Sequence, residues 1–222
     1  MKKSYKFEAH AHTAESSACA FITASELVGN YHAAGYDGVV ITDHLYAFMT
    51  TPYCDWEVYI DHLLRGYKAA KKRGKKLGME ILLGMEIRFD NVNSDFLVYG
   101  IDEDFLRANP HLNQLNPREF YKRFGDELLI IQAHPCRDHN DAHFTDAIHG
   151  IEVFNGNPRH NNNNKRAQAL YAANPHYYTL AGSDTHQPGD VGTGWVAFDQ
   201  PVTTSKQFCD LVKQRAYSHG RG

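Results

Sequence analysis

The sequence predicts one α/β domain whose strands and helices alternate and whose parallel strands close into a compact barrel. The chain has 222 residues, enough for a single domain with a sizeable core. Short apolar runs alternate with helical patterns, and seven or eight such units favour a closed barrel over an open sheet. Because the chain is short for an eight-unit barrel, we expect a distorted one. A doubly wound sheet is the alternative.

The strands are expected where short runs are rich in apolar or β-branched residues. These runs are Tyr5–Ala9, Gly38–Thr42, Ile81–Leu83, Phe96–Ile101, Leu128–Ala133, Gly150–Phe154, Tyr177–Ala181 and Gly194–Phe198.

Helical patterns lie between several of these strands. Thr23 is expected to begin the first helix as a capping residue, and Gly35 to end it. The longest helix is expected from about Asp55 to Lys76, with an apolar stripe along one face and Gly78 at its end. Two further helices are expected at Lys165–Ala173 and Ser205–Arg215.

Composition and charge exclude several classes of protein. Net charge is −3, so the chain lacks the basic excess typical of proteins that bind duplex nucleic acid. The basic run Lys71–Lys76 is interpreted as a solvated helix end. No apolar run is long enough to span a bilayer, and charged residues interrupt the region where a signal peptide would be apolar. A cytoplasmic location is expected.

The four cysteines show no CxxC spacing and are expected to be reduced thiols. They are Cys19, Cys54, Cys136 and Cys209.

Residues that suit metal binding stand at the end of the first predicted strand. The chain has 14 histidines, and His10 and His12 follow this strand in the sequence HAHT. Alternation along a strand places both imidazoles on the same face, where they can share one metal ion. An isolated HxH pair is weak evidence by itself.

Nearly every other predicted strand is also followed by a histidine or a carboxylate. The runs are ITDH with His44, GMEIR with Glu86, AHPCR with His134 and Arg137, IEVFN with Glu152 and Asn155, and GSDTH with Asp184 and His186. Any one of these residues is readily explained as a satisfied polar group near a strand end. Five strands that deliver such residues to one barrel mouth favour an active site, because packed carboxylates and imidazoles are costly without cations.

The ordered set HAHT, ITDH, GMEIR, AHPCR and GSDTH resembles the PHP family, named for polymerase and histidinol phosphatase. The resemblance runs from about Phe7 to Gly194. It implies a distorted (β/α)7 TIM-like barrel, a single domain over residues 1–222, and a cluster of two or three divalent ions. It also implies hydrolysis of phosphoesters, although some members act on other bonds. Mixed nitrogen and oxygen ligands suit zinc, manganese or iron.

The resemblance also implies how the ligands are shared among three metal sites. They are His10, His12, Glu86 and Asp184 for the first, Glu86 and His134 for the second, and His44 and His186 for the third. Two departures leave the second and third sites short of a ligand. Ala18 stands where phosphatase-type members have another histidine, and the fourth predicted strand lacks a histidine nearby. Glu15, Asp43 and Asp95 are the candidates to substitute.

Other residues are predicted to bind the substrate or to move protons. Arg137 and Arg159 are candidates for binding phosphate oxygens, with surface ion pairs as the alternative. Asn155 is expected either to orient the substrate or to cap its loop. His186 or His44, where not bound to metal, is a candidate to protonate the leaving oxygen. Glu152 is interpreted as a core-facing strand residue.

The sequence therefore predicts a phosphoesterase that hydrolyses a small phosphomonoester, of the histidinol-phosphate or nucleotide type, with a metal-activated hydroxide. Arg137 takes part in catalysis in this hypothesis. Two alternatives stay open. One is a hydrolase of amide or lactone bonds on the same fold, and the other is a metal-binding module without catalytic activity. A membrane or nucleic-acid partner is not expected.

Overall fold

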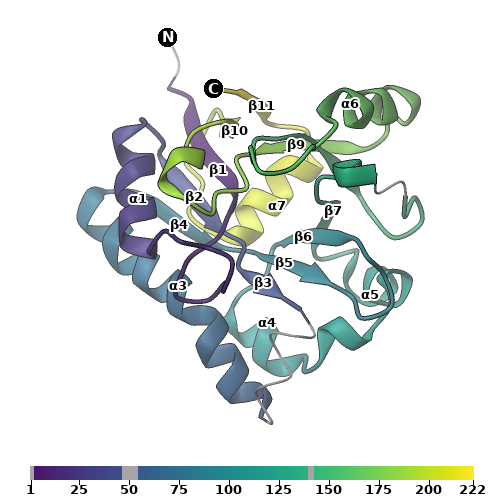
Figure 1. The fold of residues 1–222 in the computed structure, drawn as a ribbon, viewed down its shortest axis with the longest axis horizontal. Helices are drawn as coiled ribbons and strands as arrows, with labels where there is room; N and C mark the ends of the chain where they lie inside the picture. The colour runs from purple at the N-terminus through teal and green to yellow at the C-terminus, as the bar shows by residue number, and fades with distance from the viewer. Residues whose placement is uncertain (1–2, 47–54, 140–142) are drawn as a thin grey trace.

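The strands form two sheets, in a computed structural model that describes residues 3–46, 55–139 and 143–222 (Figure 1). The first sheet contains, in spatial order, β11 (Ser218–Arg221), β10 (Gly194–Phe198), β1 (Tyr5–Ala11), β2 (Gly38–Ile41) and β4 (Glu80–Leu83). The second contains β3 (His44–Leu45), β5 (Met85–Arg88), β6 (Asp95–Tyr99), β7 (Leu129–Gln132), β8 (Gly150–Asn155) and β9 (Tyr178–Gly182). Every predicted strand is present, whereas β3, β5 and β11 are absent from the predicted runs.

The two sheets are mixed, and the described residues do not form the closed barrel that the sequence predicts. Strands β1, β2 and β4 are parallel, as are β7, β8 and β9. However, β10 is antiparallel to β1, and β6 is antiparallel to both β5 and β7. The connection 89–94 between β5 and β6 explains one reversal, because a parallel crossover needs a dozen residues or more. The doubly wound alternative is not observed either.

Two short connections between strands lead the chain from the first sheet into the second. Thr42 and Asp43 separate β2 from β3, and Gly84 alone separates β4 from β5. A backbone bridge joins the sheets a second time, where His12 donates to the carbonyl of Thr185 at 2.9 Å and Thr185 donates to that of His10 at 3.2 Å. This bridge brings the end of β1 beside the loop that follows β9.

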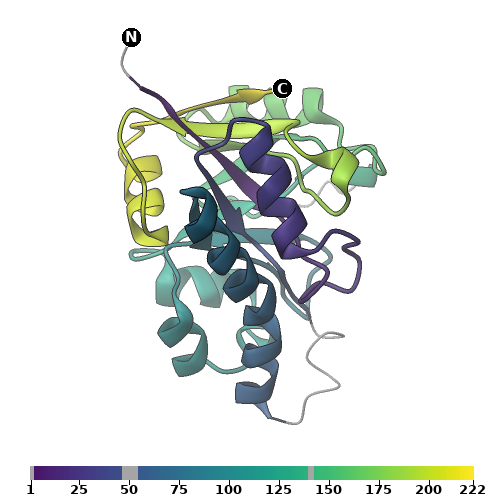
Figure 2. The same cartoon turned by 90° about the vertical axis from the view of Figure 1, so that its left-hand side faces the viewer.

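Helices cover the outer faces of the sheets. Figures 1 and 2 show α1 and α3 side by side, with α7 on another side of the first sheet. The helices are α1 (Ala24–Ala33), α3 (Trp56–Leu77), α4 (Glu103–Ala108), α5 (Pro117–Phe124), α6 (Asn164–Ala173) and α7 (Ser205–Lys213). The four predicted helices are confirmed, while α4 and α5 were not predicted. Three short 3₁₀ turns are η1 (Leu112–Gln114), η2 (Arg137–His139) and η3 (Pro188–Asp190).

The helix ends follow the sequence signals. The Thr23 side chain accepts from the backbone of Glu26, and the Asp55 side chain caps α3 in the same way. Gly78 ends α3 with a left-handed φ of 71°, a conformation that costs glycine little. These caps fix where α3 begins and ends against the first sheet.

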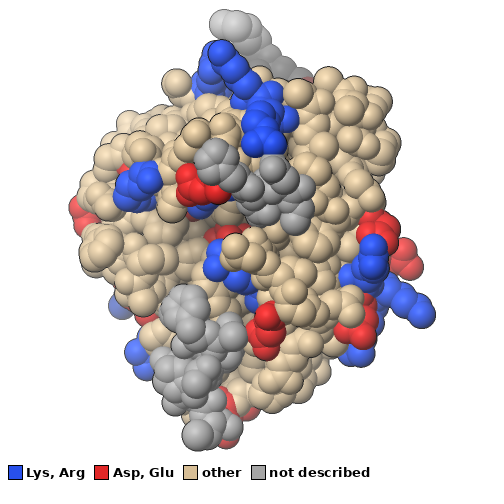
Figure 3. Space-filling view, turned by 45° about the vertical axis from the view of Figure 1, so that its right-hand side comes forward, with Lys and Arg blue, Asp and Glu red and all other residues tan. Residues whose placement is uncertain are grey.

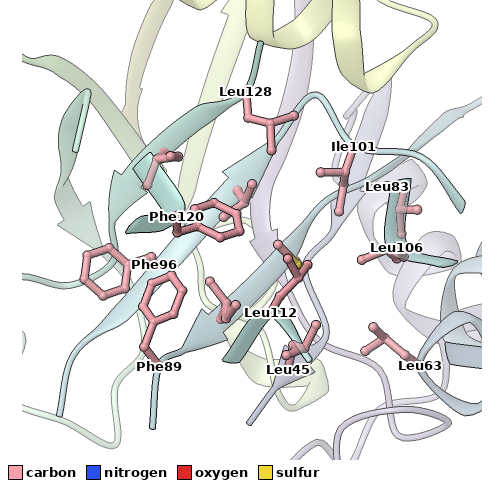
Figure 4. Close-up of a cluster of buried hydrophobic side chains, with 14 of the residues drawn as sticks. Leu45, Leu63, Leu83, Phe89, Phe96, Ile101, Leu106, Leu112, Phe120 and Leu128 are labelled. Carbon is pink, nitrogen blue, oxygen red and sulfur yellow. The ribbon is translucent and has the colours of Figure 1, made fainter. Parts of the chain in front are cut away.

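The largest apolar cluster lies between the second sheet and helices α3 to α5 (Figure 4). Phe89 is central to it, with its ring centroid 5.4 Å from those of both Phe96 and Phe120. All three rings are fully buried. Burial of such side chains contributes most of the stability of a domain. The polar site can therefore lie at the ends of the strands, outside this core.

No helix in the described ranges is both long and apolar enough to cross a membrane. The predicted location in the cytoplasm remains a prediction. Cys19, Cys136 and Cys209 are free thiols, while Cys54 lies outside the described residues.

Candidate metal centre

The predicted ligands meet beside a cavity of about 790 Å³ at the mouth formed by the two sheets. Figure 3 shows a hollow on one face of the molecule, with basic and acidic side chains at its edge. The cavity is lined by Cys19, Phe21, His44, Tyr46, Glu86, Arg88, Asn93, Asp95, His134, Arg137, Asp138, Asn157, Arg159, His160, Asp184, His186 and Gln187. His10 and His12 lie behind this lining, fully buried.

His10 and His12 point to the same side of β1, as strand alternation predicts. Their Nε2 atoms lie 3.4 and 3.3 Å from the same oxygen, Oδ1 of Asp184. The residues between and before them, Ala9 and Ala11, are buried and belong to the apolar clusters. One strand therefore separates the core from the polar site.

Glu86 is the centre of the cluster, and each of its carboxylate oxygens faces two imidazoles. Oε1 lies 3.5 Å from His10 Nε2 and 3.0 Å from His134 Nε2. Oε2 lies 3.4 Å from His12 Nε2 and 2.8 Å from His44 Nδ1. A buried carboxylate with imidazoles around both of its oxygens is a group that could be shared between two cations.

Asp95 supplies a carboxylate where a histidine was missing from the fourth predicted strand. Its Oδ2 lies 3.8 Å from His134 Nε2, and Glu86, Asp95 and His134 form one of the groups able to hold an ion. Arg88 holds Asp95 with two hydrogen bonds of 2.7 Å. Because β6 is antiparallel to its neighbours, its first residue lies at the mouth where the parallel strands end.

Asp43 and Glu15, the other two candidates, are occupied elsewhere. Asp43 accepts hydrogen bonds from the backbone and hydroxyl of Thr13 and from the hydroxyl of Ser17, at 2.7 to 2.8 Å. Glu15 accepts from the backbone of Ala24 at the start of α1. Neither is part of a potential ion-binding group in the described residues.

Asp184 and His186 stand on the loop after β9, and the loop backbone orients both. Asp184 has a φ of 52°, a region unfavourable for residues other than glycine. His134, at the end of β7, has a φ of 28°. Such conformations cost about 1–3 kcal/mol each and persist at functional sites where the surroundings impose them. The carbonyl of Asp184 lies 3.0 Å from His186 Nδ1, so that nitrogen donates and Nε2 keeps its lone pair.

The two predicted substrate-binding arginines line the cavity, but their guanidinium groups are paired with carboxylates. Arg137 bonds to Asp184, and Arg159 forms a two-bonded pair with Asp190 at 2.8 Å. Asn155 is buried behind the cavity and donates to both Glu152 and Asp184. The substrate-binding roles of these side chains remain predictions.

Glu152 is more closely tied to the site than the sequence suggested. Its Oε1 lies 3.1 Å from His10 Nδ1, and its Oε2 accepts from the backbone of His134 at 2.9 Å. A carboxylate on one ring nitrogen fixes the tautomer and leaves the other nitrogen able to bind a metal. The strand alternation of β8 could have indicated this inward position.

The pKa shifts of the histidines indicate that protons alone do not neutralise the buried carboxylates of the cluster. Burial opposes protonation of His10, but the surrounding carboxylates, Asp184 foremost, hold its pKa well above the ordinary value. For His12, burial and two neighbouring imidazoles together hold the pKa well below the ordinary value. Two imidazoles on one strand thus favour opposite charge states. A divalent cation would neutralise the carboxylates without a proton on every ring.

The residues fit a metal centre. Within the described part of the chain, His10 Nε2 and both ring nitrogens of His12 are buried without a hydrogen-bond partner. Buried polar atoms are rarely left in this way unless an ion or water satisfies them. The groups whose ligand atoms lie within 4.8 Å of one another are His12–His44–His186, His10–His12–Glu86, His10–His134–Asp184 and Glu86–Asp95–His134.

Sequence reasoning did not single out Cys19, which lies on the cavity wall. Burial raises the pKa of its thiol, but the imidazoles of His186 and His44 outweigh this effect and lower that pKa to about 6. Its place directly after Ala18, where the resemblance expects a histidine, is the signal that was available.

Known proteins resemble this chain in two ways. A family model described as PHP-associated matches residues 161–217. Among solved structures, PsfC from Pseudomonas syringae has a TM-score of 0.67 and 16% identity, over 99% of this chain and 92% of that one. A two-domain Bacteroides vulgatus protein, named as containing a predicted PHP-like metal-dependent phosphoesterase, has a TM-score of 0.69 and 17% identity, over 99% of this chain and 65% of that one.

These matches confirm the resemblance to the PHP family. A Chromobacterium violaceum amidohydrolase, solved with sulfate and no metal, has a similar fold, with a TM-score of 0.59 and 17% identity over 97% of each chain. At these identities the structural matches establish the fold alone. No curated protein sequence matches the chain significantly. In this PHP-like fold the separate sequence motifs meet at a single cavity.

Proposed function

We propose that the chain is a metal-dependent phosphoesterase that hydrolyses a small phosphomonoester. The observation that carries the proposal is the buried Glu86 carboxylate, whose oxygens lie within 3.5 Å of ring nitrogens of four histidines. Solved proteins of the same fold named as metal-dependent phosphoesterases support it. A cavity of about 790 Å³ is in the range that encloses a small molecule.

The ligands would be shared between two ions, with a third group beside them. His10, His12, Glu86 and Asp184 would hold the first ion, Glu86, Asp95 and His134 the second, and His44 and His186 a third. Bound divalent ions would supply Lewis acidity toward a phosphate oxygen and lower the pKa of a water molecule.

The protein's own side chains would orient the substrate and move the proton. Arg137 and Arg159 place positive charge on the cavity wall, although each guanidinium also neutralises a carboxylate. This charge would favour an anionic phosphate over a neutral ester. His186 donates through Nδ1 to a carbonyl, so its Nε2 is free to exchange a proton with a leaving oxygen wherever it is not a metal ligand.

A hydrolase of amide or lactone bonds is the second candidate, and a specific observation favours it. Both arginines already have carboxylate partners, so neither presents an unpaired fork to a phosphate group. The amidohydrolase of the same fold is consistent with this candidate. The alternative of a metal-binding module without activity would require the same ligands but no turnover.

Metal analysis followed by an activity screen tests the proposal. Protein purified without chelator is expected to contain zinc, manganese or iron, and to hydrolyse phosphomonoesters after loading with the same metals. His10→Ala and Asp184→Asn should abolish turnover and lower metal content while the circular dichroism spectrum is kept. Inorganic phosphate should inhibit competitively. Hydrolysis of amide or lactone substrates without phosphatase activity, and no inhibition by millimolar phosphate, would replace this proposal with the second candidate.

A further inference from the structure

One apolar side chain lines the otherwise polar cavity of the candidate metal centre. Within the part of the chain that the structure describes, Phe21 is the only lining residue whose side chain is entirely hydrocarbon. It is 74% exposed, and Val58 on α3 is the only other large apolar side chain exposed in these residues. Val58 does not line the cavity. Because water is released when an apolar group covers such a surface, Phe21 is suited to bind the apolar part of a ligand.

The exposure of Phe21 is not the result of a loose loop. Its neighbours Ala20 and Ile22 are buried, and the carbonyl of Ile22 accepts a hydrogen bond from the backbone of Ala14 at 2.9 Å. The backbone of Phe21 itself donates to the carbonyl of His186 at 2.7 Å. These bonds are made by the main chain alone. They hold Phe21 beside a histidine of the candidate metal centre and leave its side chain open to the cavity.

The tyrosine of the cavity wall offers much less open surface. The ring centroid of Tyr46 lies 4.4 Å from that of His44, and the guanidinium carbon of Arg88 lies 4.8 Å from the same ring. Tyr46 is therefore buried. In the described ranges, no aromatic ring or cation packs against Phe21 in this way. Phe21 thus provides the main open apolar surface of the cavity.

We propose that Phe21 packs against an aromatic ring in the alcohol portion of the substrate, while the metal centre binds the phosphate. The cavity of about 790 Å³ is in the range that encloses a whole small-molecule ligand, so it has room for more than a phosphate group. A flat ring covers more of a phenyl face than an alkyl chain does, and two rings also attract each other through their charge distributions. The inference rests on the proposed function and names the substrate class as phosphomonoesters that carry an aromatic ring.

Binding of non-hydrolysable phosphonates measures the contribution of the ring without turnover. The full chain, loaded with zinc or manganese, is titrated in a calorimeter with methylphosphonate and with phosphonates whose phenyl ring is attached directly to phosphorus or through a short alkyl spacer. At least one phenyl compound should bind roughly five- to 100-fold more tightly than methylphosphonate, as expected for stacking on an aromatic side chain. The cyclohexyl counterpart of that compound should gain less, because its ring is not flat.

Variants at two positions assign this preference to one side chain. Phe21→Ala should bind the phenyl compound and methylphosphonate with similar affinity, and it should keep its metal because the main-chain bond to His186 does not need the ring. Phe21→Trp should retain the preference for the phenyl compound. Val58→Ala is the matched control, since it removes an exposed apolar side chain outside the cavity, and it should retain the preference as well.

The same titrations separate a failure of this inference from a failure of the proposed function. A preference for the phenyl compound that persists in Phe21→Ala would overturn the inference. Wild-type protein that binds methylphosphonate as tightly as the phenyl compounds, or cyclohexyl compounds as tightly as phenyl ones, would also overturn it. Each of these results would leave the proposed function intact, because the phosphonate group still binds. Metal-loaded protein that binds none of the phosphonates would overturn both.

Discussion

The guanidinium of Arg137 is paired with Oδ2 of Asp184, while Oδ1 of the same carboxylate faces His10 and His12. Arg137 also donates to Asn155 at 2.9 Å and to Asn162 at 2.8 Å. The arginine therefore lies on the cavity wall and also fixes the rotation of a carboxylate that we propose as a metal ligand.

Arg137→Lys should consequently impair metal binding as well as catalysis. Lysine keeps the charge but cannot reach three partners with a planar fork, so Asp184 loses its fixed orientation. We expect metal affinity and kcat/KM to fall by roughly 10–100-fold, as for other groups that support a metal ligand. Steady-state kinetics and metal content of the purified variant measure both effects.

Arg159→Lys is the matched comparison, because its partner Asp190 is not a metal ligand in this arrangement. This variant should keep its metal and show mainly a raised KM. Equal metal loss in both variants would mean that Arg137 has no special role in orienting Asp184.

Glu152→Gln should weaken metal binding without unfolding the protein. Glutamine preserves the shape of the side chain, but its amide removes the negative charge that holds the proton on His10 Nδ1. The ring would then lose its fixed tautomer, and affinity should fall about 10–100-fold. Competition with a fluorescent chelator measures this change. Glu80→Gln, at an exposed carboxylate on β4, serves as the control, and an unchanged affinity in Glu152→Gln would reduce Glu152 to a packing role.

Gly66→Ala in α3 should destabilise the protein, although alanine is the better helix former. Ser16 inserts into α3 there, since its hydroxyl donates to the carbonyl of His62 at 3.1 Å and accepts from the backbone of Gly66 at 2.9 Å. An added Cβ would lie 1.8 Å from Thr13 Oγ1 and 2.8 Å from Asp43 Oδ2. Relief of this overlap should cost about 1–3 kcal/mol.

Gly29→Ala in α1 should change the free energy of unfolding in the opposite direction, by stabilising the protein. The nearest atom to its added Cβ is the end of the Arg73 side chain at 3.7 Å, an ordinary contact. The helix should gain about 0.5–1 kcal/mol. Urea denaturation of both variants measures the two free energies of unfolding, and a loss at Gly29 similar to that at Gly66 would exclude the steric explanation.

His149 should make the protein less stable as the pH falls below neutrality. Burial, helped by the charge of Lys213, lowers the pKa of His149 to about 4, and its Nδ1 accepts from the backbone of Ile130 at 3.1 Å. Above pH 6.5 both folded and unfolded chains carry a neutral ring. Between pH 6.5 and 4 only the unfolded chain takes up the proton, so stability falls, and below pH 4 the loss is complete.

The loss that His149 contributes should be about 1–3 kcal/mol, from a difference of roughly 2.5 pKa units at 1.36 kcal/mol each, reduced for partial exposure. The free energy of unfolding is measured at several pH values for wild type and for His149→Gln. The difference between the two curves isolates this histidine from the other titrating groups. Parallel curves from pH 7 to 4 would contradict the assignment.

Much of the local structure was predictable because it depends on nearby residues. Thr23, Asp55 and Gly78 mark helix ends through interactions within one turn, and these ends are confirmed. The shared face of His10 and His12 follows from strand alternation alone. Whether two neighbouring strands pair in parallel or antiparallel was not predictable in this way, because an apolar run has the same pattern in both. For that reason the expected closed barrel was not confirmed, and Asp95 was left among several candidates.

The partners of the polar residues were the least predictable part of the site. The sequence indicates that Arg137 and Arg159 are suited to an anion, but not whether a phosphate or a carboxylate of the same chain is nearer. The insertion of Ser16 into α3 likewise depends on a contact fifty positions along the chain. Such pairings are decided by the packing of the two sheets, which no single segment contains.

Metal ions bound beside the backbone bridge between Ala11 and Thr185 would stabilise the contact between the two sheets. His10 lies in the first sheet and His12 directly follows it, whereas Glu86 lies in the second sheet, so an ion bound by these three residues would cross-link the sheets beside this bridge. At a metal concentration 100 times Kd, the folded state would gain about 2.7 kcal/mol. For a chain of this size that gain corresponds to a rise in melting temperature of roughly 5–10 °C. Thermal denaturation can therefore rank metals by affinity before any substrate is known.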